Sequence, residues 1–163
     1  MAPLPLTRLK PHYPPFAVTG VDYFGPFEVV IFRLKVKRYG VIFTCLNTRA
    51  VHLKVAPSLT ADSFIMAFRR FISVHGQVSI CYSDNGTGLV AGEKELRACL
   101  FQWNRRGRGV EWIFNPLAAP YFGGVWERLI QTAKSALNIV LRLRTLTDEI
   151  LATAMSEVSS LLN

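Results

Sequence analysis

The first third of the chain contains short apolar runs separated by turn residues. Apolar and β-branched residues cluster in four runs, at 18–24, 27–34, 39–46 and 51–55. Short runs of this kind with brief connections predict three or four consecutive strands in an antiparallel meander. We expect the first strand to end at Gly25-Pro26 and the basic stretch 33–38 to lead into the strand at 39–46.

After Pro57 the spacing of apolar residues changes from strand-like to helical. Thr60 is a suitable N-cap, Asp62 follows in the first turn, and Gly76 ends this predicted helix. Two further strands are predicted at 78–81 and 110–114, and three further helices at 91–101, 125–142 and from Thr147 to the end. Pro120 and Gly123-Gly124 indicate a hinge-like loop before the long helix. The order predicts an α/β protein, a mixed sheet with helices on its faces.

Composition places the chain among folded basic proteins. It has 163 residues, half of them apolar, so a single domain with a real core is expected. We read the proline-rich residues 1–15 as a linker and 16–163 as the domain. The net charge of +8 favours a polyanionic partner, nucleic acid before an anionic membrane surface, although plain solubility charge is the simpler alternative.

Cysteine and histidine usage excludes several other classes of protein. The three cysteines are odd in number and lack C-x-x-C spacing, which argues against a disulfide framework and favours a reducing compartment. The three histidines lack the spacing of a zinc site. No apolar run is long enough to cross a bilayer or to form a signal peptide, so we expect an intracellular protein, nuclear or cytoplasmic, with no membrane partner.

Three carboxylates stand at positions that need a physical reason. Asp22 lies within the first strand, where Asp is disfavoured and a buried charge is costly. Asp84 directly follows a strand, and Glu127 opens the long helix. Each also has an ordinary explanation: an aspartate bonded to nearby amides, a turn residue before Asn85-Gly86, and an acid favoured by the helix dipole.

Taken together, the three acids favour a metal site. A carboxylate within a strand, another at a strand end and a third at a helix start can converge on two divalent ions. Two Mg²⁺ or Mn²⁺ ions can activate a nucleophilic oxygen and stabilise the leaving oxygen in phosphoryl transfer. On the helix that Glu127 opens, Gln131 and Lys134 fall on the same face. A basic protein with these features would act on nucleic acid.

Four sequence blocks resemble the catalytic core of retroviral-type integrases, and most closely those of Pao/BEL long-terminal-repeat retrotransposons. The blocks are Thr19-Gly20-Val21-Asp22-Tyr23-Phe24-Gly25-Pro26, Thr48-Arg49-Ala50-Val51-His52-Leu53, Ser83-Asp84-Asn85-Gly86-Thr87 and Phe122-Gly123-Gly124-Val125-Trp126-Glu127-Arg128. The resemblance covers nearly the whole chain from about Pro3 onward. It implies a ribonuclease H-like fold with a mixed five-stranded sheet and helices on both faces.

The resemblance also implies an activity and its residues. Asp22, Asp84 and Glu127 would form the Asp-Asp-Glu triad of a transferase that processes DNA 3′ ends and joins them to target DNA with two Mg²⁺ or Mn²⁺ ions. The DNA contacts would come from Lys134, Gln131, Asn85, Arg105 and Arg106, with the loop 116–124 over the DNA end. Retroviral-type cores usually form dimers or larger homo-oligomers, and the family's usual C-terminal sequence continues beyond residue 163.

Two alternatives to an active integrase remain, and the first follows from a departure from the family pattern. Gly88-Leu89 stands where an Asn-Phe pair is usual. The first alternative is an inactive nucleic-acid-binding remnant of an integrase, a transposable-element copy with the same fold. The second is a ribonuclease H-like nuclease that cleaves without joining.

Overall fold

The computed structural model describes residues 13–83, 109–114, 120–141 and 145–163, with the backbone alone for residues 114 and 120–127. The strands are β1 (Val18–Ile31), β2 (Leu34–Cys45), β3 (Val51–Ala56), β4 (Ile80–Ser83) and β5 (Glu111–Phe114). The helices are α1 (Ala61–His75), α4 (Pro120–Leu141) and α5 (Asp148–Leu162). The helix expected at 91–101 lies outside the described residues. None of the described helices is long and apolar enough to cross a membrane.

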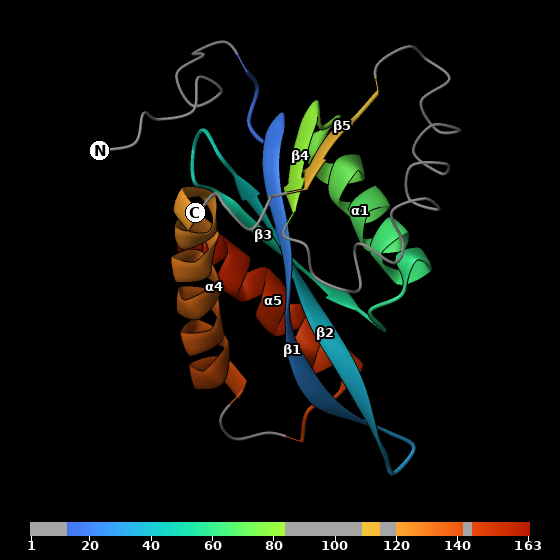
Figure 1. The fold of residues 1–163 in the computed structure, drawn as a ribbon. Helices are drawn as coiled ribbons and strands as arrows, with labels where there is room; N and C mark the ends of the chain where they lie inside the picture. Colours follow the sequence, from blue (N-terminus) through green and yellow to red (C-terminus); the bar gives the residue numbers. More distant parts are fainter. Residues whose placement is uncertain (1–12, 84–108, 115–119, 142–144) are drawn as a thin grey trace.

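The described strands form one mixed sheet in the order β3-β2-β1-β4-β5. The meander β1-β2-β3 is antiparallel, as expected, whereas β4 lies parallel to both β1 and β5. The central strand β1 therefore joins the antiparallel half of the sheet to the parallel half (Figure 1). The parallel pairs align the carboxyl ends of β4 and β5 with Val21, near the start of β1.

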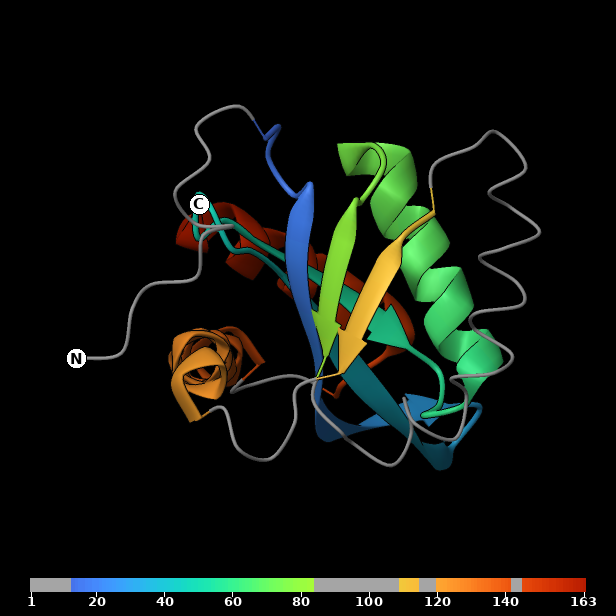
Figure 2. The same ribbon diagram turned by 45° about the horizontal axis from the view of Figure 1, so that its top comes forward.

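Helices cover both faces of the sheet, which confirms the predicted architecture (Figure 2). On one face α1 packs against Val21, Val41 and Phe43. On the other face α4 and α5 pack against Val18 and Phe24. Successive residues of β1 thus enter two different cores, as strand geometry requires.

Helix α1 forms where the sequence predicts it. The Thr60 hydroxyl accepts a hydrogen bond from the Ser63 amide at 3.4 Å, and Gly76 ends the helix with a φ of 86°. Its apolar face carries phenylalanines that stack on the sheet, with the Phe71 ring centroid 4.2 Å from that of Phe43. Burial of these rings supplies much of the apolar stabilisation on this face.

Two buried cysteines lie on either side of the same residue of β1. Thr19 pairs with Cys45 of β2 and with Cys81 of β4, and both thiols are free. The two strand spacings between them come to roughly 10 Å, which is beyond the reach of a disulfide. Both cysteines act as small core residues, as predicted.

Two predicted boundaries are wrong. Gly25-Pro26 does not end the first strand: β1 continues to Ile31, and the residues between Phe24 and Phe27 form an irregularity in its pairing with β2. β2 accordingly begins at Leu34, inside the basic stretch expected to lead into it. Proline and glycine are tolerated here because a bulge leaves their backbone groups outside the ladder.

The hinge-like loop predicted before the long helix is also wrong over the described residues. Helix α4 begins at Pro120 and includes Gly123-Gly124. Proline is favourable in the first turn of a helix, where its missing N–H has no helical partner. Residues 116–119 of the loop expected over the DNA end lie outside the described residues.

Helix α5 covers the free edge of the sheet at β3. The Leu53 amide donates to the Ser159 hydroxyl at 2.8 Å. The Val51 amide donates to the Asn163 side-chain oxygen at 2.7 Å, and the Asn163 amide group donates back to the Val51 carbonyl at 2.8 Å. Side chains of α5 thereby satisfy backbone groups that a sheet edge would otherwise present to another chain.

We expect Ser159→Ala to lower the free energy of unfolding by about 1–3 kcal/mol, because it leaves the buried Leu53 amide without an acceptor. Urea denaturation measures the change. Ser156→Ala is the matched control, since that exposed serine bonds only back to Ala152 within the same helix. Equal stability of the two variants would contradict this role of Ser159.

Candidate functional site

Asp22 is the fifth residue of β1 and lies on the face of the sheet covered by α4 and α5. It alternates with Val21 and Tyr23, which face α1, and shares its side with Val18 and Phe24. The carboxylate is partly exposed, and its Oδ1 accepts a hydrogen bond from the Tyr23 amide at 2.7 Å. The alternative of an aspartate bonded to a nearby amide thus holds for one oxygen, and that bond also orients the carboxylate.

The aromatic ring of Phe24 holds the strand beside Asp22 in register. Phe24 lies opposite Gly40 of β2, and a Cβ at Gly40 would come within 2.4 Å of the ring. Only glycine allows the ring to cover β2 in this way. Close packing next to Asp22 is therefore part of what positions its side chain.

The parallel pairing places the ends of β4 and β5 at the same height in the sheet as Val21 of β1. Val21 pairs with Ser83 of β4, and Ser83 pairs with Phe114 of β5. The Trp112 indole N–H donates to the buried Ser83 hydroxyl at 2.9 Å, which ties the ends of β4 and β5 together. Asp22 and Asp84 are the next residues after Val21 and Ser83 in the chain. In open α/β sheets, the carboxyl ends of parallel strands are where ligand and catalytic groups gather.

Helix α4 packs on the face of the sheet toward which Asp22 points. Its buried residues Ile130, Ala133 and Leu137 pack into the core that contains Val18 and Phe24. The helix also contains Glu127, whose backbone alone is described. Asp22 therefore points to the face of the sheet on which α4, the helix that contains Glu127, packs.

Of the other predicted site residues, Gln131 and Lys134 are exposed on α4. Asp84, Asn85, Arg105 and Arg106 lie outside the described residues. Within the described part of the chain, no group of three histidine, cysteine or acidic side chains could hold a metal ion. A three-carboxylate site therefore needs the side chains of Asp84 and Glu127 in addition to Asp22.

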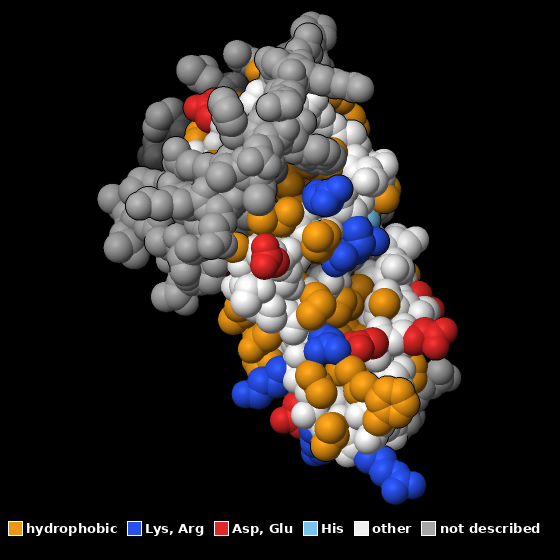
Figure 3. Space-filling model, turned by 90° about the vertical axis from the view of Figure 1, so that its right-hand side faces the viewer, with side chains coloured by type: hydrophobic (Ala, Val, Ile, Leu, Met, Phe, Trp, Pro, Cys, Tyr) orange, Lys and Arg blue, Asp and Glu red, His pale blue; other side chains and the backbone are white. Residues whose placement is uncertain are grey.

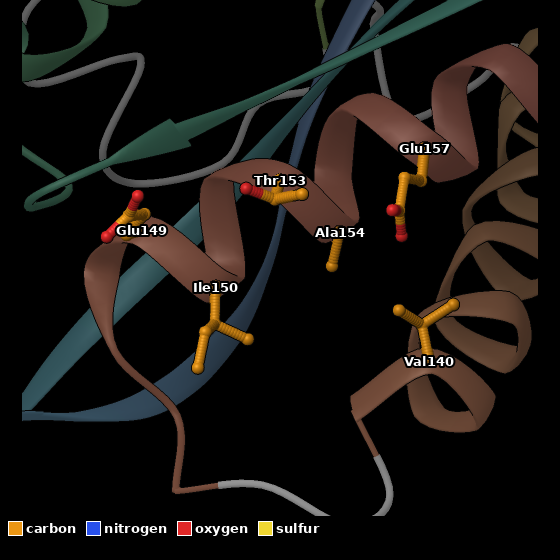
Figure 4. Close-up of a pocket in the computed structure, with 6 residues that line it drawn as sticks. All are labelled: Val140, Glu149, Ile150, Thr153, Ala154 and Glu157. Carbon is orange, nitrogen blue, oxygen red and sulfur yellow. The ribbon is translucent and has the colours of Figure 1, made fainter.

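The C-terminal end of α4 and the first turns of α5 line a half-open hollow of about 360 Å³. Figure 4 shows Ile150 and Ala154 of α5 pointing into it, with Glu157 extending toward Val140 of α4. Glu149 and Thr153 also line it. Asp22, Gln131 and Lys134, the predicted site residues whose side chains the structure describes, do not line this hollow.

Sequence reasoning missed a histidine pair between β3 and α1. His75 Nε2 lies 3.0 Å from His52 Nδ1, among the rings of Phe43 and Phe71. Burial is the main cause that lowers the pKa of His52 to about 4, with smaller contributions from the charges of Lys54 and His75. In the alternating sequence of β3, His52 falls on the same side as Lys54, opposite Val51 and Leu53, so no signal indicated its burial and nothing in the sequence pairs it with His75.

We expect the fold to lose stability as the pH falls from about 6.5 toward 4. The unfolded chain binds a proton at His52 near pH 6.5, whereas the folded chain resists it down to about pH 4, so protons favour unfolding within this window. Discounted for the partial exposure of His52, the effect is about 1–2 kcal/mol. Denaturant titrations at several pH values measure it.

His52→Phe is the test variant, because phenylalanine suits the surrounding rings and cannot be protonated. It should flatten the stability profile between pH 4 and 6.5 relative to the wild type. Parallel profiles of the two proteins would assign the acid sensitivity to other groups.

Comparison with known proteins identifies the fold. No family model and no curated protein sequence matches the chain. Among solved structures, the HTLV-2 integrase catalytic core in complex with magnesium, in its trimeric form, is similar at a TM-score of 0.62 and 18% identity, over 90% of this chain and 84% of that one. The BIV integrase catalytic core is similar at 0.62 and 19% identity, over 88% and 81%.

The fold is that of integrase catalytic cores. A chain of the simian T-cell lymphotropic virus intasome in complex with the PP2A subunit B56 gamma is also similar, at a TM-score of 0.63 and 17% identity. The match covers 87% of this chain and 48% of that one. The predicted ribonuclease H-like fold is therefore confirmed. At these identities the likeness concerns the fold alone.

Proposed function

We propose that this chain is the catalytic core of an integrase, a polynucleotidyl transferase that processes DNA 3′ ends and joins them to target DNA. The position of Asp22 carries the proposal. A carboxylate within the central strand faces the side covered by α4, beside the carboxyl ends of β4 and β5. The four sequence blocks and the shared fold of integrase cores support the same function.

The residues fit a pair of divalent ions. The proposed ligands Asp22, Asp84 and Glu127 offer only carboxylate oxygens, which suit Mg²⁺ and Mn²⁺. The Tyr23 amide orients the Asp22 carboxylate, as is common for metal ligands. The alternation of β4, with Ser83 on the α1 side, supports a place for Asp84 on the α4 side. The HTLV-2 core was solved with magnesium, which favours the same class of ion.

Each residue then has a role in moving a phosphoryl group. The bound ions would supply the positive charge that activates the attacking oxygen and stabilises the leaving one. The three carboxylates would hold water for end processing, or the DNA 3′-hydroxyl for joining, in line with the reacting phosphorus. Lys134 and Gln131 on α4, with Asn85, Arg105 and Arg106, would bind the DNA and hold its phosphates.

We expect Asp22→Asn and Asp84→Asn each to reduce strand transfer by far more than the roughly 10- to 100-fold that loss of an outer-shell partner costs. Joining of a labelled terminal-repeat duplex in Mg²⁺ or Mn²⁺ measures this. Asp62→Asn is the matched control, since Asp62 is an exposed acid in the first turn of α1 on the other face of the sheet. Wild-type activity in Asp84→Asn would falsify the proposal.

Two other functions give different results in the same experiments. An inactive remnant would bind DNA without turnover and would show no Mn²⁺ binding by calorimetry. Its supporting observation is Gly88-Leu89, directly after the proposed active-site loop. A nuclease that cleaves without joining would leave shortened products and no joined ones on a gel.

Lys134 offers a test of DNA binding that is separate from turnover. Lys134→Gln should weaken binding of all duplex sequences alike and lower the salt dependence by about one counterion, because an exposed lysine on α4 contacts a phosphate. Fluorescence anisotropy at several salt concentrations measures both quantities. Arg70→Gln, at an exposed position of α1 on the opposite face, should leave them unchanged. An unaltered salt slope in Lys134→Gln would remove Lys134 from the interface.

Three finer statements also belong to this proposal. The sequence blocks support a source in a Pao/BEL-type retrotransposon. Self-association is supported by similar cores solved as a trimer and as a dimer, and sedimentation measures it. Action on DNA within the cell, in the nucleus or cytoplasm, agrees with free cysteines at both described positions.

A further inference from the structure

The hairpin between β1 and β2 extends beyond the rest of the sheet as a ribbon of two strands. β4 pairs with β1 only as far as Val21, and β3 pairs with β2 only from Tyr39 onward. The segment from Phe27 to its partner Arg38 has no third strand among the described residues. Figure 1 shows this ribbon projecting from the lower end of the molecule.

One face of the ribbon is anchored to the start of α5. Arg38 donates from Nε and Nη2 to the two carboxylate oxygens of Asp148, at 2.8 and 3.1 Å. The Val30 amide donates to the Leu146 carbonyl at 2.8 Å, and Val29 is fully buried on this side. The ribbon is therefore held rigidly at its base, and its tip projects in a defined direction.

The tip carries a residue pair that is unfavourable for its turn. Phe32 and Arg33 connect Ile31 to Leu34 with φ angles of 46° and 70°. Positive φ at both positions is the geometry of a two-residue type I′ hairpin, which strongly prefers Asn-Gly. A bulky residue in this region costs of the order of 1 kcal/mol, and no contact within the described chain offsets that cost, because Phe32 is 96% exposed.

The surface around this phenylalanine is apolar and basic. Leu34 is 69% exposed, and Lys35 and Lys37 are exposed on the face of the ribbon turned away from α5. Glu28 lies 3.6 Å from Lys35, but the pair is solvated and leaves the ribbon with a net positive charge. Figure 3 shows hydrophobic side chains together with Lys and Arg side chains at the lower end of the molecule, where the hairpin lies.

We infer that the β1–β2 hairpin is a second DNA-binding element that enters a groove of the duplex, with Phe32 against base edges and Arg33, Lys35 and Lys37 on the phosphates. A two-stranded ribbon fits the major groove, where phenylalanine can contact thymine methyl groups. The positive ribbon complements a polyanion, whereas an apolar protein partner would leave these cations unpaired.

The length of strand between Asp22 and Phe32 sets how far from the proposed active site the hairpin would contact a duplex. Ten residues separate Asp22 from Phe32, which is about 30 Å of strand. One turn of B-DNA is about 34 Å. A duplex with its reacting phosphate at Asp22 would reach the hairpin roughly one helical turn away. This placement rests on the function proposed above, whereas the contact between hairpin and duplex does not.

The test variant is F32N/R33G, which installs the preferred turn residues. Relief of strain should leave the melting temperature equal to the wild type or higher, so loss of binding cannot come from unfolding. We expect its affinity for a duplex long enough to span the hairpin to fall about tenfold, with a salt slope smaller by about one. A duplex about one turn shorter should bind both proteins equally.

Two controls separate the hairpin from other surfaces and from catalysis. Leu161→Asn makes a similar change at an apolar side chain of α5 that is 74% exposed, and it should leave DNA affinity unchanged. Asp84→Asn should retain the dependence on duplex length, so the hairpin contact survives even where the proposed activity fails. Equal affinity of F32N/R33G and wild type for the long duplex overturns the inference. Loss of self-association or vesicle binding with unchanged DNA affinity assigns the tip to a protein or lipid contact and overturns it too.

Discussion

The register of β1 against β2, held by the Phe24 ring over Gly40, is the constraint on which the rest of the structure depends. A slip of one residue would move every side chain of β1 to the opposite face of the sheet. Asp22 would then point at the aromatic core under α1 instead of the side covered by α4. The close approach that only glycine allows is incompatible with such a slip, because a Cβ opposite Phe24 would overlap its ring. The packing of Phe24 against Gly40 therefore fixes the face of the sheet to which the Asp22 carboxylate points.

The two helical layers support this strand in different ways. α1 fills its side of the sheet with stacked rings, which bury a large apolar area but also exclude water from His52 and from Tyr23, whose pKa is raised by burial. α5 contributes hydrogen bonds to the edge strand β3 and an ion pair to the β1–β2 ribbon. α4 is held between α5 and β1 by the core that includes Ile130 and Leu137. The site and the ribbon thus share one scaffold, and a change in α5 would affect both.

The sequence predicted the architecture well because its strongest signals are local. Thr60 and Thr147 cap their helices at the positions where the sequence predicts helix starts, and the first strand contains Asp22 as expected. The errors came from residues whose local preference was overridden by tertiary context. Gly25-Pro26 predicts a turn in isolation, but pairing on both sides carries β1 through a bulge.

The candidate site could be predicted only in part, because it depends on residues far apart in the chain. The acids stood out as polar residues at costly positions, and strand order brings Asp22 to the level where β4 ends. The His52–His75 pair and the anchoring of Arg38 by Asp148 left no local trace, since each joins elements whose packing no periodicity specifies. The exposed phenylalanine of the hairpin was equally invisible, because an apolar run predicts burial.

The unfavourable turn at Phe32 and Arg33 directly follows β1, the strand that contains Asp22. A strained, exposed turn at the end of a mobile loop would destabilise the fold without fixing the position of any ligand bound to it. Here the same strand carries Asp22, and the bidentate pair of Arg38 with Asp148 fixes the ribbon against α5. A duplex bound at the tip would therefore be held at a fixed distance and orientation from Asp22. Orientation of this kind is a large part of what phosphoryl transfer requires of a protein, because the nucleophile, phosphorus and leaving oxygen must lie in line. Strain at the tip would then serve positioning at the site.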